Sequence, residues 1–171
     1  MDSYALLIAA TLNAGTVLAI ASLGLLINEK AGIVNLGAEG MMLCAAIAGF
    51  AMVVHTGSDF MGFVAGMGAG ALMAAVFGVL VIWLNTNQYA TGLALSLFGA
   101  GFSAFAGISY VQAKIPERPS FAVPFLSDIP LVGPALFRQH PLVYLTVVFA
   151  LALIWFLYRT RSGLILRSVG E

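Results

Sequence analysis

The side chains with the greatest capacity for chemistry lie in one short polar segment, residues 28–42. This segment carries Glu29, Lys30, Asn35 and Glu39 and is flanked by long apolar runs. Carboxylate, ammonium and amide groups can bind a polar solute, whereas charge within a membrane is costly unless it is paired or faces water. Irregular polar backbone at membrane depth is tolerated only where it is buried in protein or lines a water-filled cavity. The segment is therefore either an interfacial loop or part of a permeation pathway.

Three glycines in the same segment favour a broken helix. Gly32, Gly37 and Gly40 permit backbone conformations that interrupt a helix. The ends of a broken helix can then meet a polar solute. Glu29 and Lys30 belong to this broken-helix motif, although both also fit a simple position at the cytosolic interface.

Glu39 is harder to assign to the interface, because Ile33 and Val34 precede it and a long apolar run follows. We expect Glu39, with Asn35, to lie in or beside the solute pathway and to be held by internal polar partners. Asn87, in the polar break after the third apolar run, is a further candidate for this pathway.

The remaining reactive residues do not form an enzyme or metal site. His55 and Asp59 are four residues apart, but they flank a short polar turn and fit solvated positions better than a metal site. Cys44 lies in an apolar stretch and is expected to pack as a small hydrophobe. Residues 99–104 match G-x-G-x-x-A, but inside an apolar run with no strand before it. No P-loop motif occurs, so we expect the chain not to bind ATP in such a loop. We also expect no cofactor and no metal.

Composition identifies a polytopic membrane protein. The chain is 61% hydrophobic and 8% charged, with a mean hydropathy of +1.04, whereas soluble domains carry roughly 25% charged residues. No acidic or basic residue occurs from Phe60 to Ala113. The formal net charge is +0 and no basic cluster precedes Tyr158, so nucleic acid is not an expected partner.

The apolar runs predict an all-α bundle of five spanning segments, with a broken or re-entrant helix near residues 28–42. Runs of about 18 or more apolar residues are long enough to cross a bilayer. The expected spans are 4–27, a second that begins at Ile33 or Met41 and ends at Val54, 60–84, 90–109 and 142–158. All six prolines lie in 110–141, which we expect to be an ordered loop or short-helix cap outside the bilayer.

Basic residues predict the orientation. Arg159, Arg161 and Arg167 follow the last span, and positive charge is biased to the cytoplasm. The C-terminal flank and the pair Glu29–Lys30 are then inside, and the proline-rich region is outside.

Small residues predict how the helices pack. Glycine or serine recurs at every fourth position in the third and fourth spans, which lets helix backbones approach closely. These packing candidates are Gly62, Gly66, Gly70, Gly99, Ser103 and Gly107.

The polar segment also carries a resemblance. Residues 28–42 read Asn-Glu-Lys-Ala-Gly-Ile-Val-Asn-Leu-Gly-Ala-Glu-Gly-Met-Met and closely resemble the signature of inner-membrane permease subunits of ABC importers, in the branch that handles nucleosides and simple sugars. Residues 87–95 resemble the next block of that family. Residues 159–171 resemble the start of its cytoplasmic coupling loop, with Ile165 where the family often has a basic residue. The resemblance covers the whole chain.

This resemblance implies the transmembrane subunit of an ATP-driven importer, forming part of the pathway for nucleosides or related small polar solutes. It implies a separate ABC ATPase subunit, a second permease subunit, and a solute-binding lipoprotein or periplasmic receptor, in a bacterial-type inner membrane. The chain itself is then not an enzyme. The residues implied in ATPase coupling are Arg161, Gly163, Arg167, Gly170 and Glu171.

Other functions stay open: a sugar or branched-chain amino-acid ABC permease, or a non-transporting membrane scaffold. An intramembrane enzyme is disfavoured because no nucleophile–base or metal constellation is visible. Since family permeases continue past the coupling loop with a second group of helices, we expect residues 1–171 to be a single permease domain and the N-terminal part of a longer permease. A fragment or a truncated reading frame is favoured over one half of a split permease.

Overall fold

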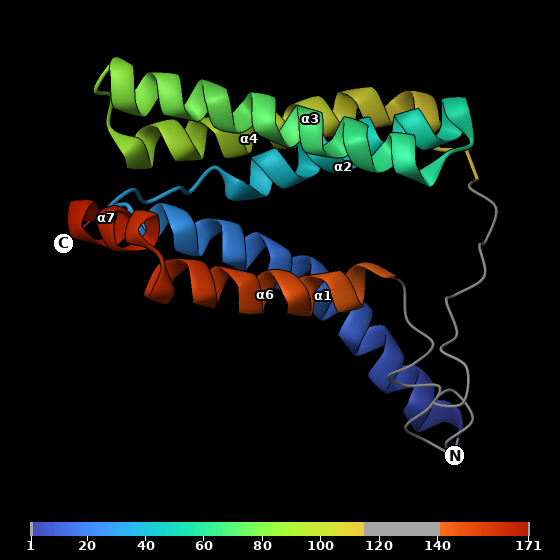
Figure 1. The fold of residues 1–171 in the computed structure, drawn as a ribbon. Helices are drawn as coiled ribbons and strands as arrows, with labels where there is room; N and C mark the ends of the chain where they lie inside the picture. The colour runs from blue at the N-terminus through green and yellow to red at the C-terminus, as the bar shows by residue number, and fades with distance from the viewer. Residues whose placement is uncertain (1, 115–140, 171) are drawn as a thin grey trace. The chain divides into compact units, whose positions relative to one another are not determined.

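The computed structural model describes residues 2–114 and 141–170, with side chains from residue 7 onward, and this part of the chain is mostly helical (Figure 1). Five of its helices are long and apolar enough to cross a membrane, which confirms the expected all-α architecture. The elements are α1 (Asp2–Lys30), α2 (Ala38–Thr56), α3 (Asp59–Gly78), the π-helical turn η1 (Val79–Trp83), α4 (Gln88–Gly107), the 3-10 turn η2 (Ile108–Tyr110), α6 (Pro141–Arg159) and α7 (Arg161–Gly170).

These helices form two compact units. The first comprises Met1–Gly32 with Glu117–Glu171 and contains α1, α6 and α7. The second is Ile33–Pro116, in which α2 packs against both α3 and α4. The boundary between the units falls inside the polar segment, directly after Gly32.

The helix ends follow local sequence signals. The start of the second span, which the sequence leaves at Ile33 or Met41, lies at Ala38. That helix ends at Thr56 and is capped by Gly57, whose φ of 67° is left-handed and whose N–H donates to the carbonyl of Val53 at 2.8 Å. The third span ends in η1, where the Leu84 N–H reaches back five residues to the Val79 carbonyl at 3.1 Å.

The proline-rich region lies mostly outside the described residues. The expectation of an ordered outer loop or short-helix cap between 110 and 141 therefore stays a prediction beyond Lys114, and Glu171 likewise lies outside.

Candidate functional site at the helix break

The polar segment begins where α1 ends. Gly32 follows the helix with a left-handed φ of 77°, and its N–H bonds the Glu29 carbonyl at 3.0 Å. A residue with a Cβ atom is strained in this conformation. Glu29 is exposed and Lys30 is half-buried in the last turn of α1, where a cation interacts favourably with the negative end of the helix.

Residues 33–37 are not helical, and side chains satisfy their backbone. The Val34 N–H donates to Gln88 Oε1 at 3.0 Å, and the Ser96 hydroxyl donates to the Leu36 carbonyl at 2.8 Å. Both side chains come from α4, 54 and 60 residues further along the chain. The Gly37 N–H donates to Oδ1 of Asn35 at 2.9 Å in a local turn.

Glycines allow this segment and α2 to lie directly against α4. A Cβ atom at Gly92 would come within 2.9 Å of the Leu36 and Gly37 nitrogens, and one at Gly99 would overlap the backbone of Gly40. The break is therefore a packed feature of the second unit. It lies along the first three turns of α4, and its irregular backbone is packed against that helix and hydrogen-bonded to it.

The three pathway candidates have different local roles. Asn35 supports the turn and also approaches the Met41 sulfur, with its Nδ2 at 3.7 Å. Asn87 caps α4, accepting from the N–H groups of Tyr89 at 2.9 Å and Ala90 at 3.2 Å. Glu39 is exposed in the first turn of α2 and makes no hydrogen bond or ion pair with the residues that the structure describes, although we expected internal partners.

Four of the coupling candidates lie on α7, the short helix that follows α6. Thr160 forms its sharp corner with α6: the hydroxyl donates to the Phe156 carbonyl at 2.6 Å and accepts from the Gly163 N–H at 3.1 Å. A Cβ atom on Gly163 would overlap the α6 backbone and come within 2.7 Å of Leu157 Cα. The Arg167 guanidinium carbon lies 4.8 Å from the centroid of the Tyr158 ring.

Two more coupling candidates lie at opposite ends of α7. Arg161 is exposed at its first residue. Gly170, its last residue, contacts the end of α1, where a Cβ atom would overlap the Lys30 carbonyl and come within 2.7 Å of the Gly32 nitrogen.

The packing candidates of α3 lie along α2. A Cβ atom on Gly62 would overlap the Val53 side chain, and one on Gly66 would come within 3.1 Å of the Ala45 carbonyl oxygen. Gly70 is less tightly packed, with 3.7 Å to Ala45 Cβ.

On α4 the contacts of the packing candidates weaken toward the C-terminal end. Gly99 makes the close contact with Gly40, Ser103 is half-buried, and Gly107 would bring a Cβ atom only within 3.9 Å of Ile47 Cδ1.

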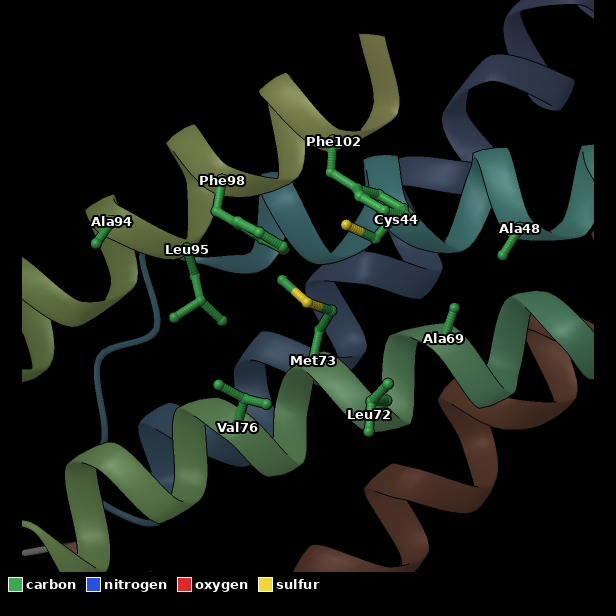
Figure 2. A pocket seen from close by; sticks show the side chains of 10 residues that line it. All are labelled: Cys44, Ala48, Ala69, Leu72, Met73, Val76, Ala94, Leu95, Phe98 and Phe102. Carbon is green, nitrogen blue, oxygen red and sulfur yellow. The ribbon is translucent and has the colours of Figure 1, made fainter. Parts of the chain in front are cut away.

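An apolar pocket of about 600 Å³ lies between α2, α3 and α4 (Figure 2). Met73 projects from α3 into this space toward Cys44 of α2 and Phe98 of α4. Alanine, aliphatic and aromatic side chains form the rest of the lining. Such a surface cannot satisfy the hydroxyl groups of a polar solute, so this pocket is a poor candidate for the solute pathway.

A hollow of about 250 Å³ between α1 and α6 carries threonines, among them Thr11, Thr16 and Thr146. Each hydroxyl donates to a carbonyl four residues earlier in its own helix, at 2.7–2.8 Å. This is the usual arrangement of threonine within a helix, and it gives no reason to assign a ligand.

Sequence reasoning missed two polar contacts. Gln88 and Ser96 bond to the break, and Gly92 lies beside it. These three residues and the packing candidates of α4 form one stripe of small or polar residues along that helix. The spacing of this stripe is visible in the sequence. His55 is exposed, as expected for a solvated turn, and its Nε2 lies 2.9 Å from the Tyr110 hydroxyl, which links the end of α2 to η2.

Comparisons with known proteins match almost the whole chain. Residues 7–171 match the family model described as "Branched-chain amino acid transport system / permease component". The chain is 43% identical over 176 residues to a protein of Haloferax volcanii provisionally named a glucose ABC transporter permease protein. It is 32% identical to the guanosine ABC transporter permease protein of Bacillus subtilis and 30% identical to the nucleoside ABC transporter permease protein of Lactococcus lactis, each over 182 residues.

These alignments cover 97–100% of this chain but 53–57% of each relative. The chain therefore spans about half the length of the curated relatives it matches. No solved structure matches it.

Proposed function

The chain belongs to the family of permease components of branched-chain amino acid transport systems, and from this premise we propose that it forms part of the membrane pathway of an ATP-driven importer. The observation that carries the proposal is the family match over residues 7–171, joined to five apolar helices. The helix break supports it, because a chain that needed only a hairpin between α1 and α2 would not require side chains of α4 to hold the connection.

The proposed solute is a small polar molecule that carries a sugar ring. One relative is provisionally named for glucose, and two are named for guanosine or nucleosides. A hexose and a nucleoside share ring hydroxyl groups, which donate hydrogen bonds to carboxylate and amide oxygens. Nucleosides are our first expectation, and a free sugar is the alternative that the 43% identity favours.

Glu39 is the strongest candidate for contact with the solute. Its carboxylate is exposed, whereas the amide oxygens of Asn35 and Asn87 already accept backbone hydrogen bonds. A carboxylate with free lone pairs can accept bonds from ring hydroxyls, and bonds to a charged acceptor are the stronger kind.

The proposed partner at α7 is a separate ABC ATPase subunit. This helix exposes Leu164, Ile165 and Val169 at 61%, 64% and 73%, together with the cationic Arg161. An exposed apolar patch with a charged margin is typical of a protein–protein contact. We further propose a second permease subunit and a solute-binding receptor on the opposite side of the membrane. The proposed location is the cytoplasmic membrane.

Uptake by the assembled transporter tests the function. The full-length permease, its ATPase and its receptor are reconstituted in liposomes with labelled guanosine, glucose or leucine in separate assays. ATP-dependent accumulation of guanosine or glucose supports the proposal and distinguishes its two arms. Accumulation of leucine alone would show that the solute is a branched-chain amino acid and carries no sugar ring. If none of the three accumulates, and the permease does not bind the ATPase, a membrane scaffold becomes the better reading.

A further inference from the structure

The C-terminal end of α7 is in backbone contact with the C-terminal end of α1. Gly170 leaves no room for a side chain: a Cβ atom there would overlap the Lys30 carbonyl oxygen and lie 2.9 Å from the Lys30 carbonyl carbon. In the other direction, a Cβ atom on Gly32 would lie 3.2 Å from Gly170 Cα. The two glycines therefore form a contact that any added atom on either side would disturb.

Both ends of α7 are held, which makes the helix a rigid connection. At its start, Thr160 and Gly163 fix it to α6 through the corner described above. In its second half, Arg167 lies over the Tyr158 ring. Since α7 is only ten residues long, about 15 Å at 1.5 Å per residue, a displacement applied to its exposed face must also move Gly170.

The contact lies at the first residue of the helix break. Gly32 is followed in the chain by residues 33–37, whose backbone the side chains of Gln88 and Ser96 hold. Gly32 also has the left-handed φ of 77° that turns the chain out of α1. A displacement of Gly32 is therefore applied to the residue that is bonded directly to the break.

We propose that the Gly170–Gly32 contact transmits movement of α7 to the helix break and so couples ATP hydrolysis to opening of the solute pathway. The inference rests on the proposed function, because it takes α7 as the surface on which the ATPase acts. Gly170 and Gly32 are positioning residues in this scheme and touch neither ATP nor the solute. A close backbone contact suits this task, since packed elements shift between discrete arrangements.

Gly170→Ala is the sharpest test. Gly170 is the last residue of α7 and has no left-handed φ, so alanine can adopt its backbone conformation without strain. The variant therefore disturbs the contact with α1 without weakening α7 itself. Gly24→Ala is the matched control, because it adds the same methyl group on α1 at a position with nothing within 4 Å.

The two variants are compared in the reconstituted full-length transporter, with guanosine and glucose as probes. We expect Gly170→Ala to lower uptake at least tenfold while ATP hydrolysis stays within about twofold of the unmodified protein. Gly24→Ala should change neither rate. The ratio of solute moved to ATP hydrolysed is the decisive readout, because a variant that only assembles poorly lowers both rates together.

A second measurement follows the break directly. In a transporter whose other cysteines, Cys44 among them, have been replaced, the substitution Leu36→Cys places a thiol at a position that is 50% exposed. Its labelling by maleimide should depend on bound ATP with Gly170 present, and should lose that dependence in Gly170→Ala.

Two results would overturn the inference. One is uptake by Gly170→Ala equal to that of Gly24→Ala; the other is a proportional loss of uptake and hydrolysis with labelling that still responds to ATP. Failure of the proposed function looks different, since the unmodified transporter would then show no ATP-dependent uptake.

Discussion

Gly40 of α2 and Gly99 of α4 lie in backbone-to-backbone contact, and neither has room for a Cβ atom. One built on Gly99 would overlap Gly40 Cα and come within 2.6 Å of the Gly40 carbonyl carbon. One built on Gly40 would lie 2.6 Å from Ser96 Cα. The crossing comes less than one turn of α2 after the end of the nonhelical residues 33–37, so it restricts where α2 can begin.

Gly99→Ala should destabilise the protein, because the obstructing atoms are backbone that cannot rotate away. We expect a loss of about 1–3 kcal/mol or more in the free energy of unfolding, as in other overpacked interiors, and a lower melting temperature in detergent. Gly101→Ala is the control on the same helix, where nothing lies within 4 Å of the added atom. Equal melting temperatures for the two variants would show that the helices separate at no cost.

The five spanning helices were predictable because uncharged apolar runs report membrane segments directly. The start of α2 was not predictable, and the sequence left it at Ile33 or Met41. The position of this start depends on Gln88 and Ser96, which bond to residues 54 and 60 positions earlier in the chain. Hydropathy along the chain contains no information on such pairings.

The sequence drew attention to residues 28–42 but did not indicate the contacts that they make. Gly32 and Gly37 lie among the nonhelical residues between α1 and α2, whereas Gly40 lies inside α2. The pairing of Gly170 with Gly32 required the turn at Thr160, which redirects the chain after α6. The sequence alone did not indicate that turn, which depends on two hydrogen bonds of the Thr160 hydroxyl.

Gln88→Ala should loosen the break by leaving the Val34 N–H without its acceptor. An unpaired, partly buried donor costs about 1–3 kcal/mol, and exchange of the Val34 amide with deuterium should accelerate. Gln88→Glu is the matched control, since its carboxylate oxygen can still accept from Val34. Slow exchange of this amide in both variants would mean that another group supplies the acceptor.

Thr160→Ala should weaken the corner between α6 and α7. The loss of an N-terminal capping hydroxyl costs about 0.5–2 kcal/mol, and the Gly163 amide should exchange faster with deuterium. Thr160→Ser retains the hydroxyl and should behave like the unmodified protein. Ser168→Ala, which removes an exposed hydroxyl of the same helix bonded to the Ile165 carbonyl, should leave the Gly163 amide unchanged. The prediction fails if alanine and serine at position 160 give the same exchange rate.

Glu39→Gln tests the proposed role of the exposed carboxylate in solute binding. Replacing a charged acceptor by a neutral one weakens its hydrogen bonds, which are worth about 1.5–3 kcal/mol each. Since about 1.4 kcal/mol is a factor of ten in affinity, we expect the KM for uptake of guanosine or glucose to rise roughly tenfold. Glu39→Ala, which also removes the remaining acceptor oxygen, should raise it further. Neither substitution should reduce the amount of protein in the membrane by much, because the interaction of Glu39 with the first turn of α2 contributes only about 0.3–1 kcal/mol.

Glu29→Gln provides the control for this change. Glu29 is an exposed carboxylate of the same polar segment, but it lies in the last turn of α1, where a negative charge is unfavourable to the helix. Its removal should leave KM unchanged and the protein at least as stable. If both glutamine variants transport like the unmodified protein, Glu39 is an interfacial charge and the pathway runs elsewhere. If both lose uptake equally, the segment requires negative charge in general, and no contact between Glu39 and the solute need be assumed.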